Sequence, residues 1–242
     1  MGFSRGRPLF NNEDTLAWVP VDQRATLAYS FIDTLADLHV LDPDAVGLGS
    51  LGKKEDYIGR QIKAWYRSWE SSIEFAQLDD PRAHEFKAFF LANQPAQVTA
   101  SVVHGDYYLH NCLFSEASKV SAVLDWELAT LGDPLADLGY TLRAWPEIDD
   151  DPFLEPTAPT AVSGLPLRGE LAQRYSERTG FPVDLLDYYV GFNHWKTAAI
   201  LHGVYARYQA GQKSSEGVDL EALKDGILKG LAGAERAILR LQ

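Results

Sequence analysis

The sequence has only one cysteine, Cys112, among its 242 residues. A single cysteine excludes an internal disulfide, and we therefore expect a reducing compartment, the cytoplasm. The sequence also has no apolar run that approaches the roughly 20 residues of a membrane span. Its first ten residues, MGFSRGRPLF, lack the apolar core of a signal peptide. No membrane partner is expected.

Basic residues are also few. The sequence has 22 Lys and Arg against 34 Asp and Glu, which gives a formal net charge of −12. Proteins bind nucleic acids mainly through Lys and Arg that neutralise phosphates, and no basic run is present here. We therefore expect no nucleic-acid partner. A phosphorylated anion can still bind an acidic protein when a divalent cation lies between them.

Most of the sequence has the pattern of helices. Apolar residues recur at helical spacing over residues 22–40, 56–75, 81–93, 134–144, 167–179, 184–209 and 217–240. Asp22 is expected to cap the first of these helices, and Asp80 and Asp133, each followed by proline, two others. His194 and Trp195 are expected in a helix core, with contact to an acceptor as the alternative. Residues 146–166 contain five prolines and are predicted to form a loop.

A short β-rich part lies near the middle of the chain. Residues 98–103 are apolar and β-branched, and residues 113–114 and 120–124 are strand-like on both sides of a polar pentapeptide. This arrangement predicts a strand followed by a β hairpin. The expected fold is therefore mostly α, in the α+β class, with a small β hairpin.

The stretch Gly47–Lys54, GLGSLGKK, resembles a phosphate-binding loop. It fits G-x-G-x-x-G and the body of G-x-x-x-x-G-K, but both motifs need a preceding strand and a following helix. Here a predicted helix precedes the glycines, with no room for a strand. A magnesium-binding Ser or Thr should also follow Lys53, and the next residue is Lys54. We predict a surface turn.

The segment His104-Gly-Asp-Tyr-Tyr-Leu-His-Asn111 has a stronger chemical pattern. It lies between a predicted strand and the hairpin, and the hairpin ends at Asp125. Phosphoryl transfer needs a carboxylate that orients and deprotonates the attacking hydroxyl, together with hard oxygen ligands for Mg²⁺. Asp106 and Asn111 have the five-residue separation of a kinase catalytic Asp and Asn, and Asp125 provides a later carboxylate.

Several stretches together resemble the aminoglycoside phosphotransferase family, which has a protein-kinase-like fold and includes choline-kinase relatives. The resemblance is greatest to the branch associated with acyl-CoA dehydrogenases, and it covers the chain from Gly6 to about residue 212. The matching stretches are His104-Gly-Asp106, Asn111, Leu124-Asp-Trp-Glu127, Gly132-Asp-Pro134, Asp137-Leu138, Leu38-His39, Asp42-Pro43, Gly47-Leu48, Arg60-Gln61 and Trp65.

The resemblance implies an ATP- and Mg²⁺-dependent phosphotransferase that acts on a hydroxyl of a small molecule. It implies roles for six residues: Asp106 as catalytic base, Asn111 and Asp125 as ligands of the magnesium that binds the nucleotide, and His104, Glu127 and Asp137 as supporting residues. Of the supporting residues, His104 is structural and Asp137 braces the loop, whereas Glu127 has no firm role. The implied acceptors are a hydroxyacyl-CoA, an aminoglycoside-like compound or an amino alcohol, with the first favoured.

The resemblance implies one kinase-like C-terminal lobe over residues 1–242, with a hinge remnant at 1–12 and the catalytic loop and metal-binding hairpin at 98–127. No stretch matches the N-terminal lobe, which carries a glycine loop and a lysine paired with a helix Glu. The sequence is then a fragment, the partner of a separate N-terminal lobe, or a natural lone lobe. Without that lobe we expect weak ATP binding and little turnover.

Alternative interpretations stay open. An isolated Asp in a loop usually forms a turn, so Asp106 has catalytic meaning only together with Asn111 and Asp125. Asp137 could be a solvated helix residue. A catalytically impaired lobe or pseudokinase that acts as a binding module is the main alternative function, and a magnesium-dependent hydrolase is another. The histidines lack zinc-site spacing.

Overall fold

The computed structural model describes residues 4–147, 157–214 and 216–241. The chain forms two compact units, which we call the mixed unit (Met1–Glu55 with Gln97–Leu186) and the helical unit (Asp56–Ala96 with Asp187–Gln242). Where the chain leaves and re-enters the mixed unit, Gln97 Nε2 donates a hydrogen bond to the Lys54 carbonyl oxygen at 2.7 Å. None of the described helices is long and apolar enough to span a bilayer.

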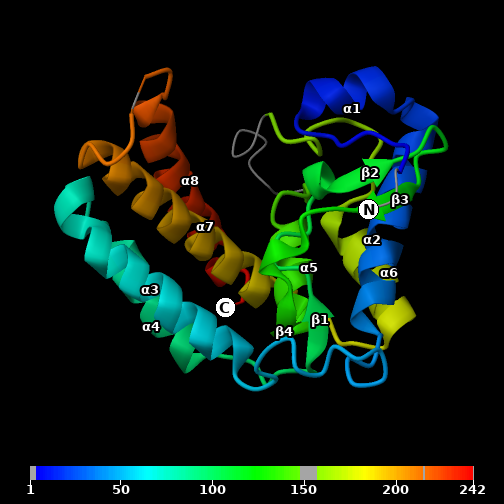
Figure 1. The fold of residues 1–242 in the computed structure, drawn as a ribbon, viewed down its shortest axis with the longest axis horizontal. Helices are drawn as coiled ribbons and strands as arrows, with labels where there is room; N and C mark the ends of the chain where they lie inside the picture. Colours follow the sequence, from blue (N-terminus) through cyan, green and yellow to red (C-terminus); the bar gives the residue numbers. More distant parts are fainter. Residues whose placement is uncertain (1–3, 148–156, 215, 242) are drawn as a thin grey trace. The chain divides into compact units, whose positions relative to one another are not determined.

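The mixed unit combines helices with two small antiparallel sheets (Figure 1). Its described helices are α1 (Asn12–Trp18), α2 (Arg24–His39), α5 (Pro134–Leu142) and α6 (Arg168–Thr179). Strand β1 (Ser101–Val103) pairs with β4 (Thr130–Gly132), and β2 (Cys112–Phe114) pairs with β3 (Val120–Val123). Short 3-10 turns lie at Val21–Gln23, Leu109–Asn111 and Trp126–Leu128. The backbone of Arg7 pairs with Phe114 and so extends the second sheet.

The core of the mixed unit lies along one face of α2. Leu27, Phe31 and Leu35 recur at helical spacing and are almost fully buried. Phe31 stacks on Tyr107 with ring centroids 4.6 Å apart, and the Tyr107 hydroxyl donates to the Phe31 carbonyl at 2.8 Å. Tyr107 follows Asp106, so this core contact anchors the 104–111 loop from behind.

The helical unit consists of α3 (Tyr57–Ala76), α4 (Pro81–Ala92), α7 (Leu186–Gln209, which begins at the last residue of the mixed unit) and α8 (Leu220–Leu239). Trp69 stacks on His202 at 3.9 Å, and the Trp195 indole donates to the Ala83 carbonyl at 3.0 Å. His194 and Trp195 are both buried, as expected for core residues. Gly233 on α8 has no room for a Cβ, because it would come within 2.7 Å of the His194 ring.

Most of the predicted elements are confirmed. The helices match their predicted ranges to within a few residues, Asp80 and Asp133 cap α4 and α5, and the hairpin of β2 and β3 forms as expected. Residues 148–156 of the predicted proline-rich loop lie outside the described residues.

Other local predictions were wrong. Asp22 does not cap α2, because it lies inside the 3-10 turn Val21–Gln23, and the residue before the helix is Gln23. Helix α1 was not predicted; it begins at Asn12, and the Asn11 side chain accepts from the Asp14 N–H at 2.9 Å. The first strand covers only Ser101–Val103 of the predicted 98–103.

Candidate active site

Asp106 lies in the loop that follows β1, and two side chains donate hydrogen bonds to its carboxylate. Asn111 Nδ2 donates to Asp106 Oδ2 at 3.1 Å and to the Asp106 carbonyl oxygen at 2.9 Å. The Tyr140 hydroxyl, from α5, donates to Asp106 Oδ1. These donors fix the direction of the carboxylate.

The contacts of Asn111 also fix which end of its amide is available. Nδ2 is the donor end and faces Asp106, so the carbonyl oxygen Oδ1 points away from that carboxylate. Asn111 ends the turn Leu109–Asn111 and is mostly buried, which limits the freedom of its side chain. An amide oxygen in a fixed direction is a suitable ligand for a hard cation.

Asp125 is held close to this loop by the backbone before it. The Leu124 N–H donates to the Asn111 carbonyl at 2.7 Å, and Asp125 itself has a left-handed backbone conformation with φ of 62°. That conformation ends β3 abruptly and begins the 3-10 turn Trp126–Leu128, in which Glu127 is exposed. The hairpin thus brings Asp125 to the same end of the mixed unit as Asn111.

His104 joins the two aspartate-bearing segments. Its Nε2 lies 2.8 Å from the Leu124 carbonyl oxygen, which can only accept, so Nε2 carries the proton. Nδ1 then accepts from the Asp106 N–H at 3.3 Å. The imidazole is fully buried and fixes the backbone beside both Asp106 and Asp125. The structural role expected for His104 agrees with these contacts.

Asp137 lies on α5 behind the loop and is almost fully buried. Its carboxylate accepts from the backbone N–H groups of His104 and Gly105, the latter at 2.9 Å, and its Oδ2 lies 3.5 Å from His39 Nε2. Burial acts to raise the pKa of Asp137, but His39 and the two N–H groups outweigh it and hold the pKa below its usual 3.8. Asp137 is therefore buried against the backbone of the 104–111 loop and is not a solvated helix residue.

Two residues near Asp106 were not found by sequence reasoning. Burial raises the pKa of Tyr140 to about 12, so its hydroxyl keeps the proton that it donates to Asp106. His110 Nε2 lies 4.0 Å from Asp106 Oδ2, and burial lowers its pKa below 6.5, which leaves it neutral at pH 7. Tyr140 could have been found, because it follows Asp137 by about one helical turn and so lies on the same side of α5.

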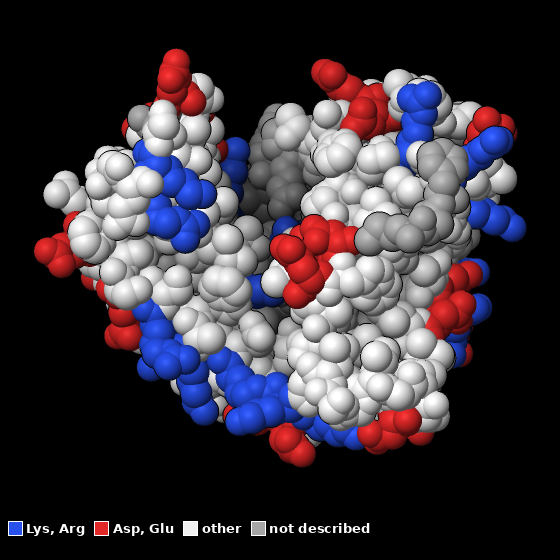
Figure 2. All heavy atoms as spheres, in the orientation of Figure 1, with Lys and Arg blue, Asp and Glu red and all other residues white. Residues whose placement is uncertain are grey.

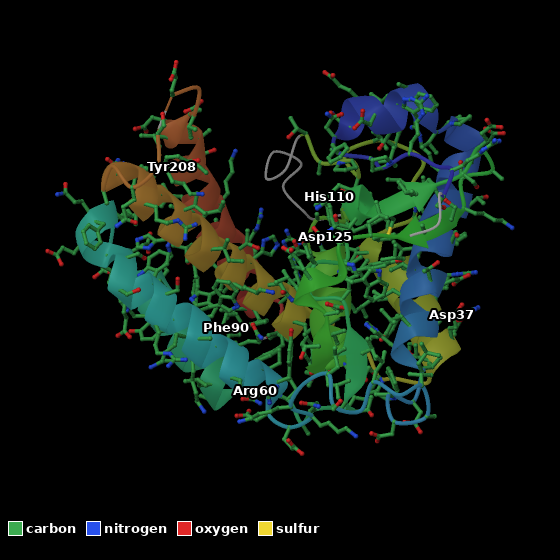
Figure 3. The ribbon with its side chains drawn as sticks, in the orientation of Figure 1. Asp37, Arg60, Phe90, His110, Asp125 and Tyr208 are labelled. Atoms are coloured by element: carbon green, nitrogen blue, oxygen red, sulfur yellow. The ribbon has the colours of Figure 1, made fainter. Side chains whose placement is uncertain are left out.

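The surface around this site is acidic. Figure 3 labels His110 and Asp125 at this end of the mixed unit, and Figure 2 shows acidic side chains gathered over the same part. No group of three or more His, Cys, Asp or Glu that could hold a metal occurs in the part of the chain that the structure describes. The Asn111 amide oxygen and the Asp125 carboxylate are oxygen donors of the kind that a hard cation prefers.

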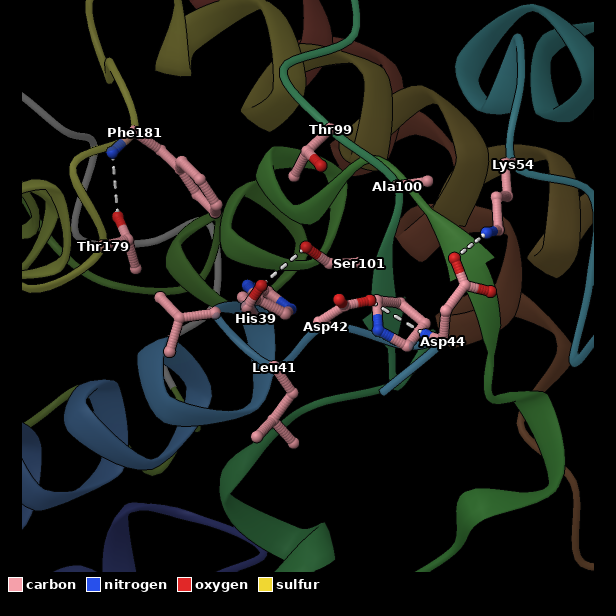
Figure 4. Close-up of a pocket in the computed structure, with 12 residues that line it drawn as sticks. His39, Leu41, Asp42, Asp44, Lys54, Thr99, Ala100, Ser101, Thr179 and Phe181 are labelled. Atoms are coloured by element: carbon pink, nitrogen blue, oxygen red, sulfur yellow. Dashed lines mark hydrogen bonds and ion pairs between the residues drawn. The ribbon is translucent and has the colours of Figure 1, made fainter. Parts of the chain in front are cut away.

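The glycine-rich stretch Gly47–Lys54 forms turns and bends, as predicted, and no helix begins there. Lys54 Nζ forms an ion pair with Asp44 Oδ2 at 2.6 Å. A Cβ on Gly49 would collide with the Asp44 side chain. The turn borders a cavity of about 490 Å³ whose lining also includes His39 and Ser101 (Figure 4). The Lys54 charge is thus already compensated by a carboxylate.

A model of the phosphotransferase enzyme family matches residues 5–165. The chain belongs to this family. Among curated proteins, acyl-CoA dehydrogenase family member 10 of Mus musculus is 34% identical over 210 residues, which cover 84% of this chain and 19% of that protein. The chain spans only about a fifth to a quarter of the length of the curated relatives that it matches.

Solved structures give the same family and fold. A Ralstonia eutropha protein described as an aminoglycoside phosphotransferase has a TM-score of 0.80 at 28% identity, over 98% of this chain and 72% of its own. Choline kinase from Cryptosporidium parvum has a TM-score of 0.62 at 13% identity, over 98% of this chain and 70% of its own, and is similar in fold alone. The family resemblance and the mostly helical, kinase-like phosphotransferase fold are therefore confirmed.

Proposed function

We propose that this chain carries the catalytic residues of a kinase that transfers the γ-phosphoryl group of ATP to a hydroxyl of a small molecule. The observation that carries the proposal is the arrangement of Asp106, Asn111 and Asp125 around one loop and one hairpin, in a member of a phosphotransferase family. Solved relatives of the same fold include a GDP complex and an ADP-bound aminoglycoside phosphotransferase, so both adenine and guanine nucleotides deserve testing.

Asp106 is the proposed catalytic base. Its carboxylate is oriented by Asn111 and Tyr140, and it is part-exposed, so an acceptor hydroxyl can reach it. The carboxylate would orient this hydroxyl and accept its proton as the oxygen attacks the γ-phosphorus. His104 and Asp137 would keep Asp106 in place through the backbone of the loop, because both contact that backbone directly.

Asn111 and Asp125 are the proposed ligands of Mg²⁺. Their donor atoms suit this ion, since it prefers carboxylate and amide oxygens and usually completes its coordination with phosphate oxygens and water. The amide oxygen of Asn111 is directed away from Asp106 because Nδ2 already bonds that carboxylate. Bound Mg²⁺ would neutralise charge on the nucleotide phosphates in this acidic site. Glu127 lies two residues from Asp125 and is proposed only as a supporting residue.

We also propose that an N-terminal lobe, from a longer chain or a separate protein, completes the nucleotide site. Three apolar side chains around Asp125 are exposed in the described structure: Leu124 at 40%, Trp126 at 43% and Leu128 at 57%. Large apolar side chains grouped on a surface often mark a contact with another structural part. A lobe that covers them would hold the nucleotide against Asp125.

The favoured acceptor is a hydroxylated acyl-CoA, with an aminoglycoside-like compound and an amino alcohol as the other candidates. Support comes from the curated relatives, which are acyl-CoA dehydrogenase family members. Assays with a hydroxyacyl-CoA, an aminoglycoside and choline would separate the three classes. The last two compounds are cationic and the first is strongly anionic, so the outcome would also reveal the charge preference of the acceptor site.

The experiment is a phosphotransfer assay with MgATP or MgGTP and this acceptor panel, on this chain and on a longer chain that carries the proposed N-terminal lobe. Asp106→Asn should reduce turnover by at least about a hundredfold, since general base catalysis contributes on this scale. Asp225→Asn, on the exposed side of α8, is the matched control and should keep full activity. Undiminished turnover in Asp106→Asn would refute the base assignment.

Two further outcomes identify the alternatives. Release of inorganic phosphate without any acceptor product would indicate a magnesium-dependent hydrolase. If neither this chain nor the longer one shows a calorimetric response to MgATP or MgGTP, the chain is a binding module rather than a kinase. Asp125→Ala should raise the Mg²⁺ concentration needed for half-maximal activity, which separates metal binding from base catalysis.

A further inference from the structure

A second cavity of about 490 Å³ opens on the mixed unit, and none of its lining residues belongs to the 104–111 loop. Its walls come from four places: the extended segment before α1, the end of α1, helix α2, and the turn between β2 and β3. The Arg7–Phe114 backbone pairing and a hydrogen bond of 2.8 Å from Ser118 Oγ to Gln23 Oε1 hold these walls together. The walls of the cavity are therefore held together by hydrogen bonds within the fold.

The floor of the cavity is apolar. Four of its lining residues, Leu9, Val19, Leu27 and Phe114, are almost fully buried. Trp18, at the rim, is 48% exposed, although a tryptophan normally gains free energy by burial. A volume in the range of small-molecule sites, with an apolar lining and a few polar groups, is typical of a ligand pocket.

The rim of the cavity is cationic. Arg5 and Arg7 both line it, and among the described residues no carboxylate forms an ion pair with either guanidinium. The Arg7 guanidinium lies 3.0 Å from the centroid of the Trp18 ring, which leaves its N–H groups available in the plane of the group. The single acidic lining residue is Glu116, exposed on the hairpin turn.

A third arginine adds to this positive charge. Arg24 is buried beside Val19, and its guanidinium donates to the carbonyl oxygens of Val19 at 3.3 Å and Ser163 at 2.6 Å. Carbonyl oxygens satisfy its hydrogen bonds but do not cancel its charge. The protein has a net charge of −12, whereas the cavity lining carries two arginines and one glutamate.

We propose that this cavity binds a small organic anion, with its carboxylate or phosphate on Arg5 and Arg7 and its apolar body on the floor. An anion would gain charge-assisted hydrogen bonds from the two guanidiniums, for which planar carboxylates and phosphates are the matching partners. Its chain or ring would cover Leu27, Phe114 and the exposed part of Trp18. The site is independent of the proposed kinase reaction, so each can fail without the other.

The test is isothermal titration calorimetry at low salt with octanoate, naphthalene-2-carboxylate and the neutral 1-octanol. At least one of the two anions should bind at least tenfold more tightly than 1-octanol and should weaken as salt is added. The double variant Arg5→Gln/Arg7→Gln should remove that preference. Arg67→Gln, on the exposed face of α3 in the helical unit, is the matched control and should keep it.

A second variant tests whether the anion binds in this cavity, because a larger side chain fills the cavity. Ala117 is exposed on the hairpin turn and lines the cavity, so Ala117→Trp should block the floor while leaving both arginines in place. Thermal unfolding of each free variant checks that it is folded. Three results would overturn the proposal: no heat with either anion, equal affinity for anion and alcohol, or unchanged anion binding in both variants.

Discussion

His39 Nε2 lies 3.5 Å from Asp137 Oδ2, and both side chains are buried in the mixed unit. On its other side, His39 Nδ1 lies 2.7 Å from the Tyr175 hydroxyl of α6. Since Asp137 holds the backbone N–H groups of His104 and Gly105, the chain of contacts runs from α6 through α2 and α5 to the loop that carries Asp106. The direction of Asp106 thus depends on residues that lie outside the 104–111 loop.

Replacing His39 by leucine should lower the free energy of unfolding by about 3 kcal/mol, because Asp137 would keep a buried charge without its histidine partner. Tyr175→Phe removes a single neutral hydrogen bond and should cost only about 1 kcal/mol. Urea denaturation gives both values. Hydrogen exchange at the His104 and Gly105 amides should speed up in His39→Leu, and unchanged exchange there would show that the brace does not reach the loop.

Tyr140→Phe should lower the proposed phosphotransfer rate roughly ten- to hundredfold, since one hydrogen bond to a charged group is worth about 1.5–3 kcal/mol. The reason is that the Tyr140 hydroxyl fixes Asp106 Oδ1, while Asn111 fixes only the other oxygen. Steady-state kinetics on the longer chain would measure the loss, which should fall on kcat more than on KM. Tyr29→Phe, on α2, serves as the control, and equal rates in both variants would contradict a role for Tyr140.

Stability should decline in mild acid because of His202. Burial lowers the pKa of His202 below its ordinary 6.5 while its Nε2 donates to the Leu78 carbonyl at 2.8 Å. The unfolded chain therefore binds this proton more readily, so the contribution of His202 to stability is complete above pH 6.5 and is lost as the pH falls below it. His110 acts in the same direction.

Thermal unfolding between pH 7.5 and 5.5 measures this effect. The Tm should fall with pH, and it should fall less steeply in His202→Gln, although this variant also loses the stacking on Trp69 and so starts from a lower Tm. His84→Gln is the control, because His84 lies at the surface beside Asp79. If the Tm of His202→Gln fell with pH as steeply as the Tm of the original protein, His202 would not be the source of the acid sensitivity.

Cys112 should react slowly with thiol reagents in the folded protein. It is fully buried at the start of β2, and burial raises the pKa of its thiol to about 12. Compared with a free cysteine of pKa about 8.5, the thiolate fraction at neutral pH falls by roughly three thousandfold. The rate of labelling with a chromogenic disulfide should therefore be limited by unfolding. Labelling should become fast in denaturant, and it should be faster in the less stable variant His39→Leu than in the original protein. Rapid labelling of the native protein would mean that the hairpin opens.

Local chemistry explains why much of this fold could be predicted from the sequence. Asp133 caps α5 with a hydrogen bond of 3.1 Å to the Leu135 N–H, and the following proline fits the first helical turn, so the start of the helix is encoded in adjacent residues. The hairpin of β2 and β3 is equally local. The five-residue spacing of Asp106 and Asn111 matches a known catalytic loop, and the structure brings the two side chains together, while their catalytic roles stay predictions.

Tertiary contacts explain what could not be predicted. Strand β4 has three residues, too few for an alternating pattern, and it exists because it pairs with β1. His39 lies in one of the stretches that resemble the family, but nothing near it in the sequence points to its contact with Asp137. The half-buried state of His110 depends in the same way on packing that no local pattern encodes.

The hydrogen bond between Gln97 and the Lys54 carbonyl has an evolutionary consequence. It links the segment that precedes α3 to the segment that follows α4. Because its ends are tethered, the segment between them can vary, within the limits set by its packing on α7 and α8, while the end of α2 and the start of β1 keep their places. Residues 56–96 could thus change in sequence while the loop that carries Asp106 keeps its position.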